Sequence, residues 1–310
     1  MPNRLSGKPA KIFRAGTTLF KGPIMNVSTQ MITTADIIKR ARPAYAAILD
    51  FYSRVFEAQE KNRERISIPP IQIDPDLLAV RKKNEMPLID PSEFRIDREA
   101  AVTLFMEICD LAGDWAPHLA EEAAVMNTAV EEGRIDLDAL FSALLDSRFE
   151  PLEKTARAVG VSAEHLSMIT YLSMAPGIEI AAQDLGVHLA PQSGLKNGYC
   201  PVCGNAPNMG FLDDAGSRHL ICCFCHHTWQ VRRIGCAFCG NQDMENQGYF
   251  FSDQEREYRV SWCDHCHNYI KVVDLRHLSR DFFPKLEMAA TLHLDMQATE
   301  KGYKGHALPT

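Results

Sequence analysis

Nine of the ten cysteines in this 310-residue chain lie between Cys200 and Cys266, and eight of them form four C-x-x-C pairs. Two residues between cysteines let the backbone wrap so that both sulfur atoms meet one ion. The spacings C-x2-C-x18-C-x2-C and C-x2-C-x23-C-x2-C are both typical of tetrahedral four-cysteine sites. This pattern constrains the fold more than any other feature, because it predicts a small module built around two metal ions.

The cysteine-rich segment is an internal repeat. Each copy begins with C-x-x-C-G-N, passes through a candidate hairpin, reaches a second C-x-x-C pair and leaves on a strand. The hairpin turns are expected at 213–216 and around 252–257, and the exit strands at 228–234 and 269–273. The sequence therefore predicts a metal ribbon built twice, a rubredoxin-like or zinc-ribbon β module over 196–273.

The repeat also divides the cysteines between the two ions, because each copy carries a complete ligand set. The glycine after each leading pair, Gly204 or Gly240, is expected to adopt positive φ and to turn backbone amides toward sulfur. A cross-braced arrangement, with the first pair joined to the third and the second to the fourth, stays open. In the sequential arrangement the ligands are Cys200, Cys203, Cys222 and Cys225 for one ion, and Cys236, Cys239, Cys263 and Cys266 for the other.

The metal is either iron or zinc, since both accept four thiolates. The knuckle CPVCG is also the one found in rubredoxins, which hold one iron. Four thiolates close the coordination shell, so hydrolysis at the metal is not expected. The two ions are predicted to stabilise a module that could not fold without them. The alternative is a role in redox sensing or electron transfer.

The stretch ICCFCHHTW, residues 221–229, holds one cysteine more than a knuckle needs. Alignment of the two copies matches Cys222 and Cys225 with the pair of CDHC and sets Cys223 against Asp264. Cys223 is thus expected in the knuckle turn, pointing away from the ion. It is either an incidental small residue or a thiol that can oxidise beside the metal.

Aromatic residues flank the knuckles as well. Trp229 and Trp262 are expected on strands beside the two sites, where they would shield the metals from water. A histidine can replace a cysteine as a ligand. With eight well-spaced cysteines available, the adjacent histidines are instead expected near the surface; they are His226, His227, His265 and His267.

Residues 30–192 are predicted to form a helical domain. Apolar residues recur at i, i+3, i+4 and i+7, and Asp97, Asp136 and Ser162 stand where N-caps are expected. The helix that follows Ser162 is expected to end near 174–177, where a proline interrupts it. Proline-rich segments separate the other helices.

The predicted fold class is α+β: an N-terminal α-helical domain, the tandem ribbon module with two four-cysteine sites, and a closing helix. That helix is indicated by the apolar pattern over 282–296. The expected organisation is a flexible tail over 1–29, the helical domain over 30–192, the ribbon module over 196–273, the C-terminal helix over 274–303 and a tail over 304–310.

Charge argues against a nucleic-acid partner. The formal net charge of the chain is −7, and 196–273 holds seven basic and eight acidic residues. Each four-thiolate site with a divalent ion adds −2, so the module carries about −5, whereas phosphate binding needs a basic surface. The chain also lacks the apolar runs of a signal peptide or a membrane span. The sequence thus predicts a cytoplasmic protein without membrane insertion.

The motifs CPVCG, CCFC, CAFC and CDHC, together with the strand at Trp229, the residues 269–271 and the tail LHLDMQATEKGY, resemble the formate dehydrogenase accessory protein (FdhE) family. The resemblance is close over 200–303 and architectural over about 30–190. It implies a cytoplasmic maturation factor that binds the catalytic subunit of a respiratory formate dehydrogenase. It also implies iron in two rubredoxin-like sites, held by the same eight cysteines.

The leading hypothesis is thus an accessory protein rather than an enzyme. No dinucleotide-binding or phosphate-loop motif is present, and no convincing nucleophile–base arrangement. The runner-up is a redox-active iron–thiolate or sulfur-handling protein, and a zinc-ribbon nucleic-acid-binding protein is the third. The sequence is compatible with a homodimer.

Overall fold

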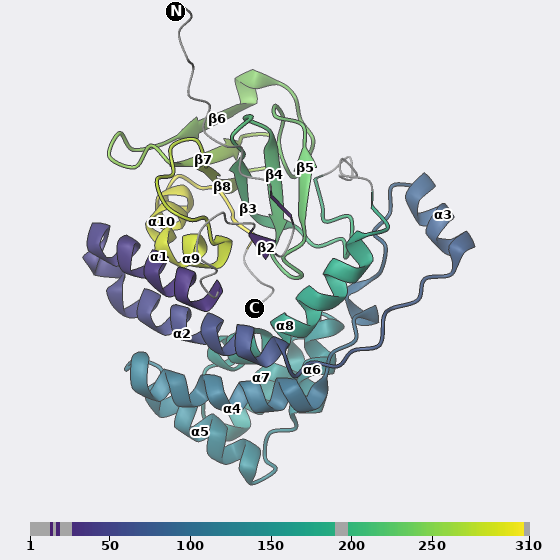
Figure 1. The fold of residues 1–310 in the computed structure, drawn as a ribbon, viewed down its shortest axis with the longest axis vertical. Coiled ribbons are helices and arrows are strands. Elements are labelled where there is room, and N and C mark those ends of the chain that lie inside the picture. Colours follow the sequence, from purple (N-terminus) through teal and green to yellow (C-terminus); the bar gives the residue numbers. More distant parts are fainter. Residues whose placement is uncertain (1–12, 15–16, 19–26, 190–197, 307–310) are drawn as a thin grey trace, which may run out of the picture.

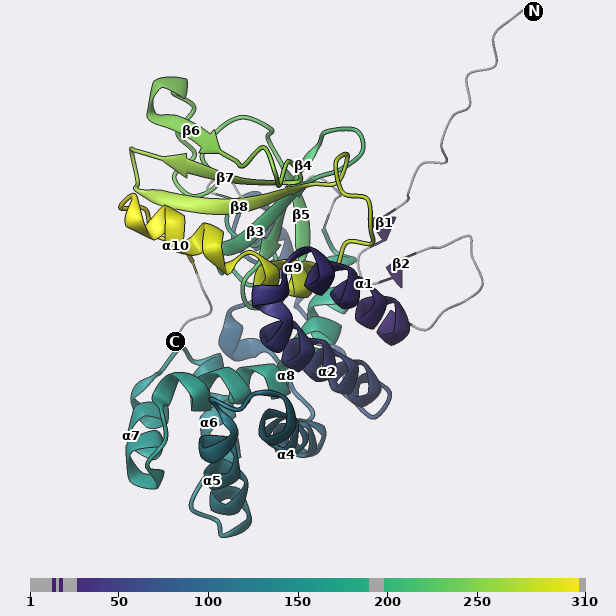
Figure 2. The same ribbon diagram turned by 90° about the vertical axis from the view of Figure 1, so that its left-hand side faces the viewer.

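The structure is a computed structural model that describes residues 13–14, 17–18, 27–189 and 198–306. Most of the predicted tail over 1–29, residues 190–197 and the last four residues lie outside this range. Helices form one half of the molecule and a β-sheet the other, with two C-terminal helices between them (Figures 1 and 2). The predicted α+β class is confirmed. None of the described helices is long and apolar enough to cross a membrane.

The helices before the sheet are α1 (Val27–Ala41), α2 (Ala46–Arg63), α3 (Pro75–Lys83), α4 (Arg98–Trp115), α5 (Ala120–Glu131), α6 (Leu137–Leu145), α7 (Glu150–Val159) and α8 (Ala163–Gly186). The short strands β1 (Phe13–Arg14) and β2 (Thr17–Thr18) precede them. Asp97, Asp136 and Ser162 cap α4, α6 and α8, since each side chain accepts a hydrogen bond from a backbone N–H of the first turn. These three predicted helix starts are confirmed.

Helix α8 does not end where the sequence predicted. It continues through Pro176 to Gly186, and both residues at the expected break, Pro176 and Gly177, are buried inside it. Proline lacks an N–H, so the Leu172 carbonyl loses its helical partner. The buried side chain of Gln59 on α2 replaces that partner, because its Nε2 donates to the Leu172 oxygen at 2.7 Å. Gln59, which is distant in the sequence, thus stabilises α8 across a proline that would otherwise be expected to end the helix.

The ribbon module forms one continuous sheet in the order β5-β4-β3-β8-β7-β6. Its strands are β3 (Pro207–Leu212), β4 (Arg218–Cys222), β5 (Thr228–Val231), β6 (Gln247–Phe250), β7 (Tyr258–Cys263) and β8 (Asn268–Asp274). The hairpins predicted at 213–216 and 252–257 are confirmed. The predicted strand over 228–234 is too long, because β5 ends at Val231 and the chain then turns toward the second copy.

The two copies of the repeat are joined edge to edge. Strand β3, the first of copy one, pairs in parallel with β8, the last of copy two, with Met209 opposite Lys271 and Leu212 opposite Asp274. All other pairings in this sheet are antiparallel and lie within one copy. The sheet therefore continues from one ribbon to the next, leaving β5 and β6 at its edges.

The closing helix is divided in two, α9 (Pro284–Ala290) and α10 (Leu292–Glu300), with a break at Thr291. Helix α9 packs against α1 and α2, and α10 lies along β8 (Figure 2). Polar contacts, the first of them buried, fix both helices to the sheet. Tyr258 donates to Glu287 at 2.5 Å, and Lys271 pairs with Asp295 at 2.6 Å. The break lets one apolar segment contact two differently oriented surfaces.

We predict that Gln59→Leu destabilises the protein by roughly 1–3 kcal/mol, because the Leu172 carbonyl is then buried without a partner. In a Pro176→Ala background the cost should be smaller, since the restored amide can donate to that carbonyl. Denaturant unfolding of both single variants and the double variant measures this coupling. Equal costs in the two backgrounds would contradict the assigned role of Gln59.

Candidate metal centres

The eight paired cysteines gather in two groups, and within each group the sulfur atoms lie within 4.8 Å of one another. The first cluster contains Cys200, Cys203, Cys222 and Cys225, and the second contains Cys236, Cys239, Cys263 and Cys266. The structure therefore groups them sequentially, one cluster in each copy of the repeat, and not in the cross-braced arrangement. Both clusters are able to hold a metal ion.

The spacing of the sulfur atoms fits a tetrahedral ion. In the first cluster the Cys200–Cys225 and Cys203–Cys222 Sγ separations are 3.6 and 3.5 Å. In the second cluster the Cys236–Cys266 and Cys239–Cys263 separations are 3.6 and 3.8 Å. Metal–sulfur bonds of about 2.3 Å place tetrahedral ligands about 3.8 Å apart. Disulfide sulfurs, in contrast, are bonded at about 2.05 Å.

Each knuckle turns on a residue with positive φ directly after its second cysteine. Gly204 and Gly240 have φ of 75° and 69°, as predicted. His226 and His267 adopt 54° and 53° at the same position of the other two knuckles. The turns point amides at sulfur, as in the 3.4 Å contact from the Phe224 N–H to Cys222 Sγ. Such donors stabilise the thiolate form that binds metal.

The first cluster is part of the main hydrophobic core, and all four of its cysteines are buried. The segment over 87–89, between helices, packs directly against its leading knuckle. The Leu88 and Ile89 amides donate to the carbonyls of Pro201 and Val202, each at 3.0 Å. A Cβ on Gly204 would lie 2.9 Å from Pro87, so this close approach requires glycine.

A buried carboxylate links the first cluster to the helices. Glu179 on α8 accepts from His226 at 2.7 Å and from Lys285 of α9 at 2.5 Å, and it also pairs with Arg63 of α2. Burial would raise the pKa of Glu179, but Lys285, His226 and Arg63 together hold it well below its usual value. Tyr171 of α8 also donates to the Phe224 carbonyl at 2.6 Å. His226 is thus a half-buried anchor, and the expectation of a surface residue was wrong.

The second cluster lies closer to the surface. Cys239 is exposed, Cys236 and Cys266 are half-buried, and only Cys263 is buried. Its last knuckle is braced by the end of the described chain: the Lys304 N–H donates to the His267 carbonyl at 2.8 Å. The neighbouring Tyr303 hydroxyl donates to Asp264 at 2.9 Å. The two clusters therefore share a local plan and differ in their access to solvent.

Cys223 takes no part in either cluster. Its side chain is 3% exposed, and its amide donates to the Ala206 carbonyl at 3.0 Å. A hydrogen bond with Cys222 and burial together raise the pKa of the Cys223 thiol. A buried thiol of raised pKa is a poor nucleophile, which favours the small-residue interpretation.

The other residues named from sequence are divided between core and surface. Trp229 is buried in the main core, whereas Trp262 is half-buried with its ring stacked on Tyr303 at 5.4 Å. His227 is half-buried, with its ring parallel to that of Trp229, and His265 is exposed. None of the flanking histidines joins the described clusters.

Fold and clusters together define a class of protein: a helical scaffold that carries a tandem four-cysteine ribbon. The model of the FdhE central domain matches residues 199–233, which include the first cluster. An FdhE homologue of Aquifex aeolicus is 26% identical over 86% of this chain and 89% of the relative. One from Shewanella baltica is 34% identical, over 35% of this chain and 36% of the relative.

The crystal structure of the FdhE protein from Pseudomonas aeruginosa has the same fold. It superposes with a TM-score of 0.62 at 18% identity and covers 92% of this chain and 96% of its own. The likeness extends through the helices as well as the ribbon module. The chain is thus similar in sequence to FdhE proteins over most of its length, and it shares the fold of the Pseudomonas aeruginosa protein.

Neighbouring cysteines should differ sharply in their effect on metal content. We predict that Cys222→Ala loses one bound metal, because three thiolates no longer close the site, whereas Cys223→Ala keeps both. Elemental analysis of the two variants, purified side by side without oxygen, measures this difference. Equal metal loss in both variants would overturn the ligand assignment.

The difference in exposure predicts two rates of metal release. A chelator added to the folded protein should remove one equivalent fast, from the second cluster, and the other only slowly. Metal release followed over time provides the measurement, and a Cys239→Ala variant should lack the fast equivalent. A single phase of two equivalents would show that exposure does not control release.

Proposed function

We propose that this protein is an accessory factor that holds one metal ion in each four-cysteine cluster and acts in the maturation of a formate dehydrogenase. It binds the catalytic subunit of that enzyme in the cytoplasm. Sequence similarity to the FdhE homologue of Aquifex aeolicus is the observation that carries the proposal, because it spans 86% of this chain and therefore includes helices as well as the ribbon module.

The chemistry of the clusters supports a binding role rather than catalysis. Four thiolates leave no open coordination position, so neither ion can activate water or substrate directly. None of the ten cysteines forms a disulfide bond, which suits a reducing compartment. A metal in the first cluster fixes the knuckles against α8, and the closed scaffold then presents one preformed surface to a partner.

The metal is iron or zinc, and the family resemblance favours iron. Anaerobic purification followed by elemental analysis and visible absorption separates the two, since an iron–tetrathiolate centre is coloured and a zinc centre is not. The half-exposed second cluster is the feature that favours a second candidate function, electron transfer. A colourless protein with two zinc ions would remove that candidate.

The maturation role is tested in a strain that lacks this gene and is grown under conditions that require formate dehydrogenase. We predict that formate dehydrogenase activity falls strongly and is restored by the natural chain and by Cys223→Ala. Cys222→Ala should fail to restore it. A deletion strain with normal formate dehydrogenase activity would overturn the proposal.

Binding is tested separately by co-purification. A tagged chain, produced without oxygen together with the catalytic subunit, should retain that subunit, and Cys223→Ala should do the same. Cys222→Ala should retain less of it, because the docked knuckle loses its metal. Loss of activity in the deletion strain without co-purification would support the maturation role while rejecting direct binding.

A further inference from the structure

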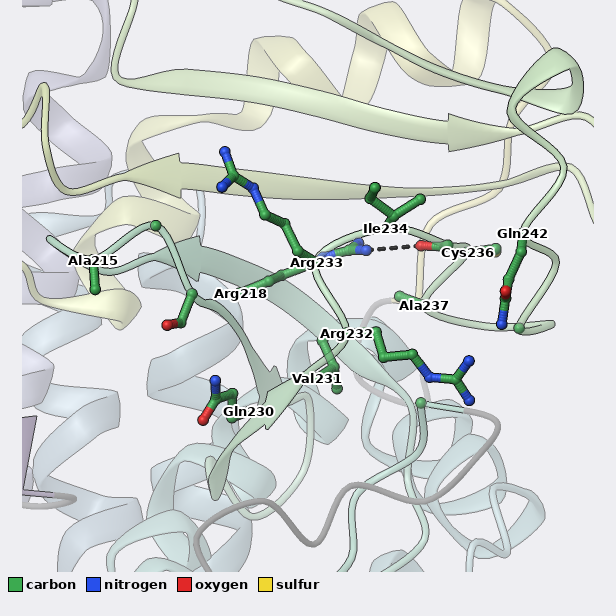
Figure 3. A pocket seen from close by; sticks show the side chains of 15 residues that line it. Ala215, Arg218, Gln230, Val231, Arg232, Arg233, Ile234, Cys236, Ala237 and Gln242 are labelled. Atoms are coloured by element: carbon green, nitrogen blue, oxygen red, sulfur yellow. Dashed lines mark hydrogen bonds between the residues drawn. The ribbon is translucent and has the colours of Figure 1, made fainter.

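A cleft of about 610 Å³ lies where the first copy of the ribbon continues into the second. Three arginines line it, Arg218, Arg232 and Arg233, and no Asp or Glu is among the described residues of its wall (Figure 3). Glycines and small side chains form most of the remaining wall. We call it the arginine cleft; its lining residues are 198, 215–218, 230–237, 240 and 242.

Arg218 is the most unusual member of the arginine cleft. It projects from β4 and is only 6% exposed, and its Nη1 donates to the Gly235 carbonyl at 2.8 Å, the dashed line in Figure 3. Its Nε is buried without a hydrogen-bond partner, and no carboxylate of the described residues pairs with it. A buried guanidinium without a paired carboxylate is unfavourable, so an anion bound in the cleft would stabilise it.

The other two arginines flank Arg218. Arg232 and Arg233 follow β5 and are exposed, and their guanidinium groups lie on opposite sides of Arg218 in Figure 3. A Cβ on Gly216 would lie 3.5 Å from Nη1 of both Arg233 and Arg276, so two cationic groups approach each other there. Asp274 neutralises Arg276 at 2.6 Å, whereas no ion pair involves Arg232 or Arg233 within the described chain.

We propose that the arginine cleft binds a small molecule that carries a phosphate or carboxylate group. The planar guanidinium fork matches both oxyanions, and three cationic side chains in a wall whose described residues include no Asp or Glu raise the local concentration of anions. The volume of the cleft lies in the range of small-molecule sites, which is about 300–1,000 Å³. Arg218 is only 6% exposed, so the small accessible part of its side chain suits a single anionic group better than a flat protein surface.

A competing explanation is that Arg218 offsets the negative charge of the second metal cluster. Cys236 lies in the same wall, and four thiolates around a divalent ion carry a charge of about −2. Under this explanation Arg218 is needed to retain the metal ion and has no role in binding an anion. The explanation does not account for the open volume or for two further unpaired arginines at its rim.

The test is a calorimetric titration of the metal-loaded full-length protein with inorganic phosphate and, separately, with succinate, at constant ionic strength. We expect saturable binding of at least one of the two ions, and the better ligand identifies the oxyanion class. Arg218→Gln and the double variant Arg232→Gln/Arg233→Gln should each weaken it by about tenfold or more, because each removes charge-assisted hydrogen bonds.

Arg256→Gln is the matched control, since Arg256 is an exposed arginine of the same module whose only described ion pair is with Asp253 at 3.7 Å. Binding to this variant should be unchanged. Equal weakening in the control, or no saturable binding of either ion, would overturn the proposal. Metal loss from Arg218→Gln with undiminished oxyanion binding would favour the charge-offset explanation. If Arg218→Gln does not fold, the exposed double variant decides the question.

Discussion

Four sulfur atoms held together inside the main hydrophobic core are the constraint on which the rest of this structure depends. The first cluster is buried among residues of the helices as well as the sheet. Its two knuckles present backbone carbonyls at Pro201, Val202 and Phe224, and each of these accepts a hydrogen bond from the helical half. Loss of the cluster geometry would therefore disturb the whole interface and not the ribbon alone.

Glu179 extends this constraint to the other end of the chain. One buried carboxylate meets Arg63 from α2, the imidazole of His226 from the knuckle after Cys225 and Lys285 from α9. Neutralisation by several partners holds the pKa of Glu179 low and keeps it ionised in the core. Because breaking such a network leaves buried charge uncompensated, helices, ribbon and C-terminal segment are stabilised as one unit. The proposed role as a preformed binding scaffold depends on that coupling.

The duplicated ribbon places two similar clusters in unlike environments. The first lies against helices, and the second is reached by solvent and is braced by residues 303–304 of the C-terminal segment. Parallel pairing of β3 with β8 joins the copies into one sheet, and the chain that crosses between them lines the arginine cleft. The junction of the two copies thus forms a surface that neither copy has by itself. The proposed oxyanion site lies at this junction.

The sequence by itself determined the features that local chemistry dictates. Cysteine spacing predicted two four-cysteine sites, and the repeat favoured the sequential grouping while the cross-braced one stayed open. Turn residues predicted both hairpins, and Asp97, Asp136 and Ser162 predicted three helix starts. Only the tertiary structure decided that Gln59 carries α8 past Pro176, that His226 meets Glu179, and that Arg218, Arg232 and Arg233 line one cleft. The physical reason is that each of these depends on a partner far away in the chain. Spacing and propensity record neighbours along the sequence, whereas burial and charge compensation depend on neighbours in space.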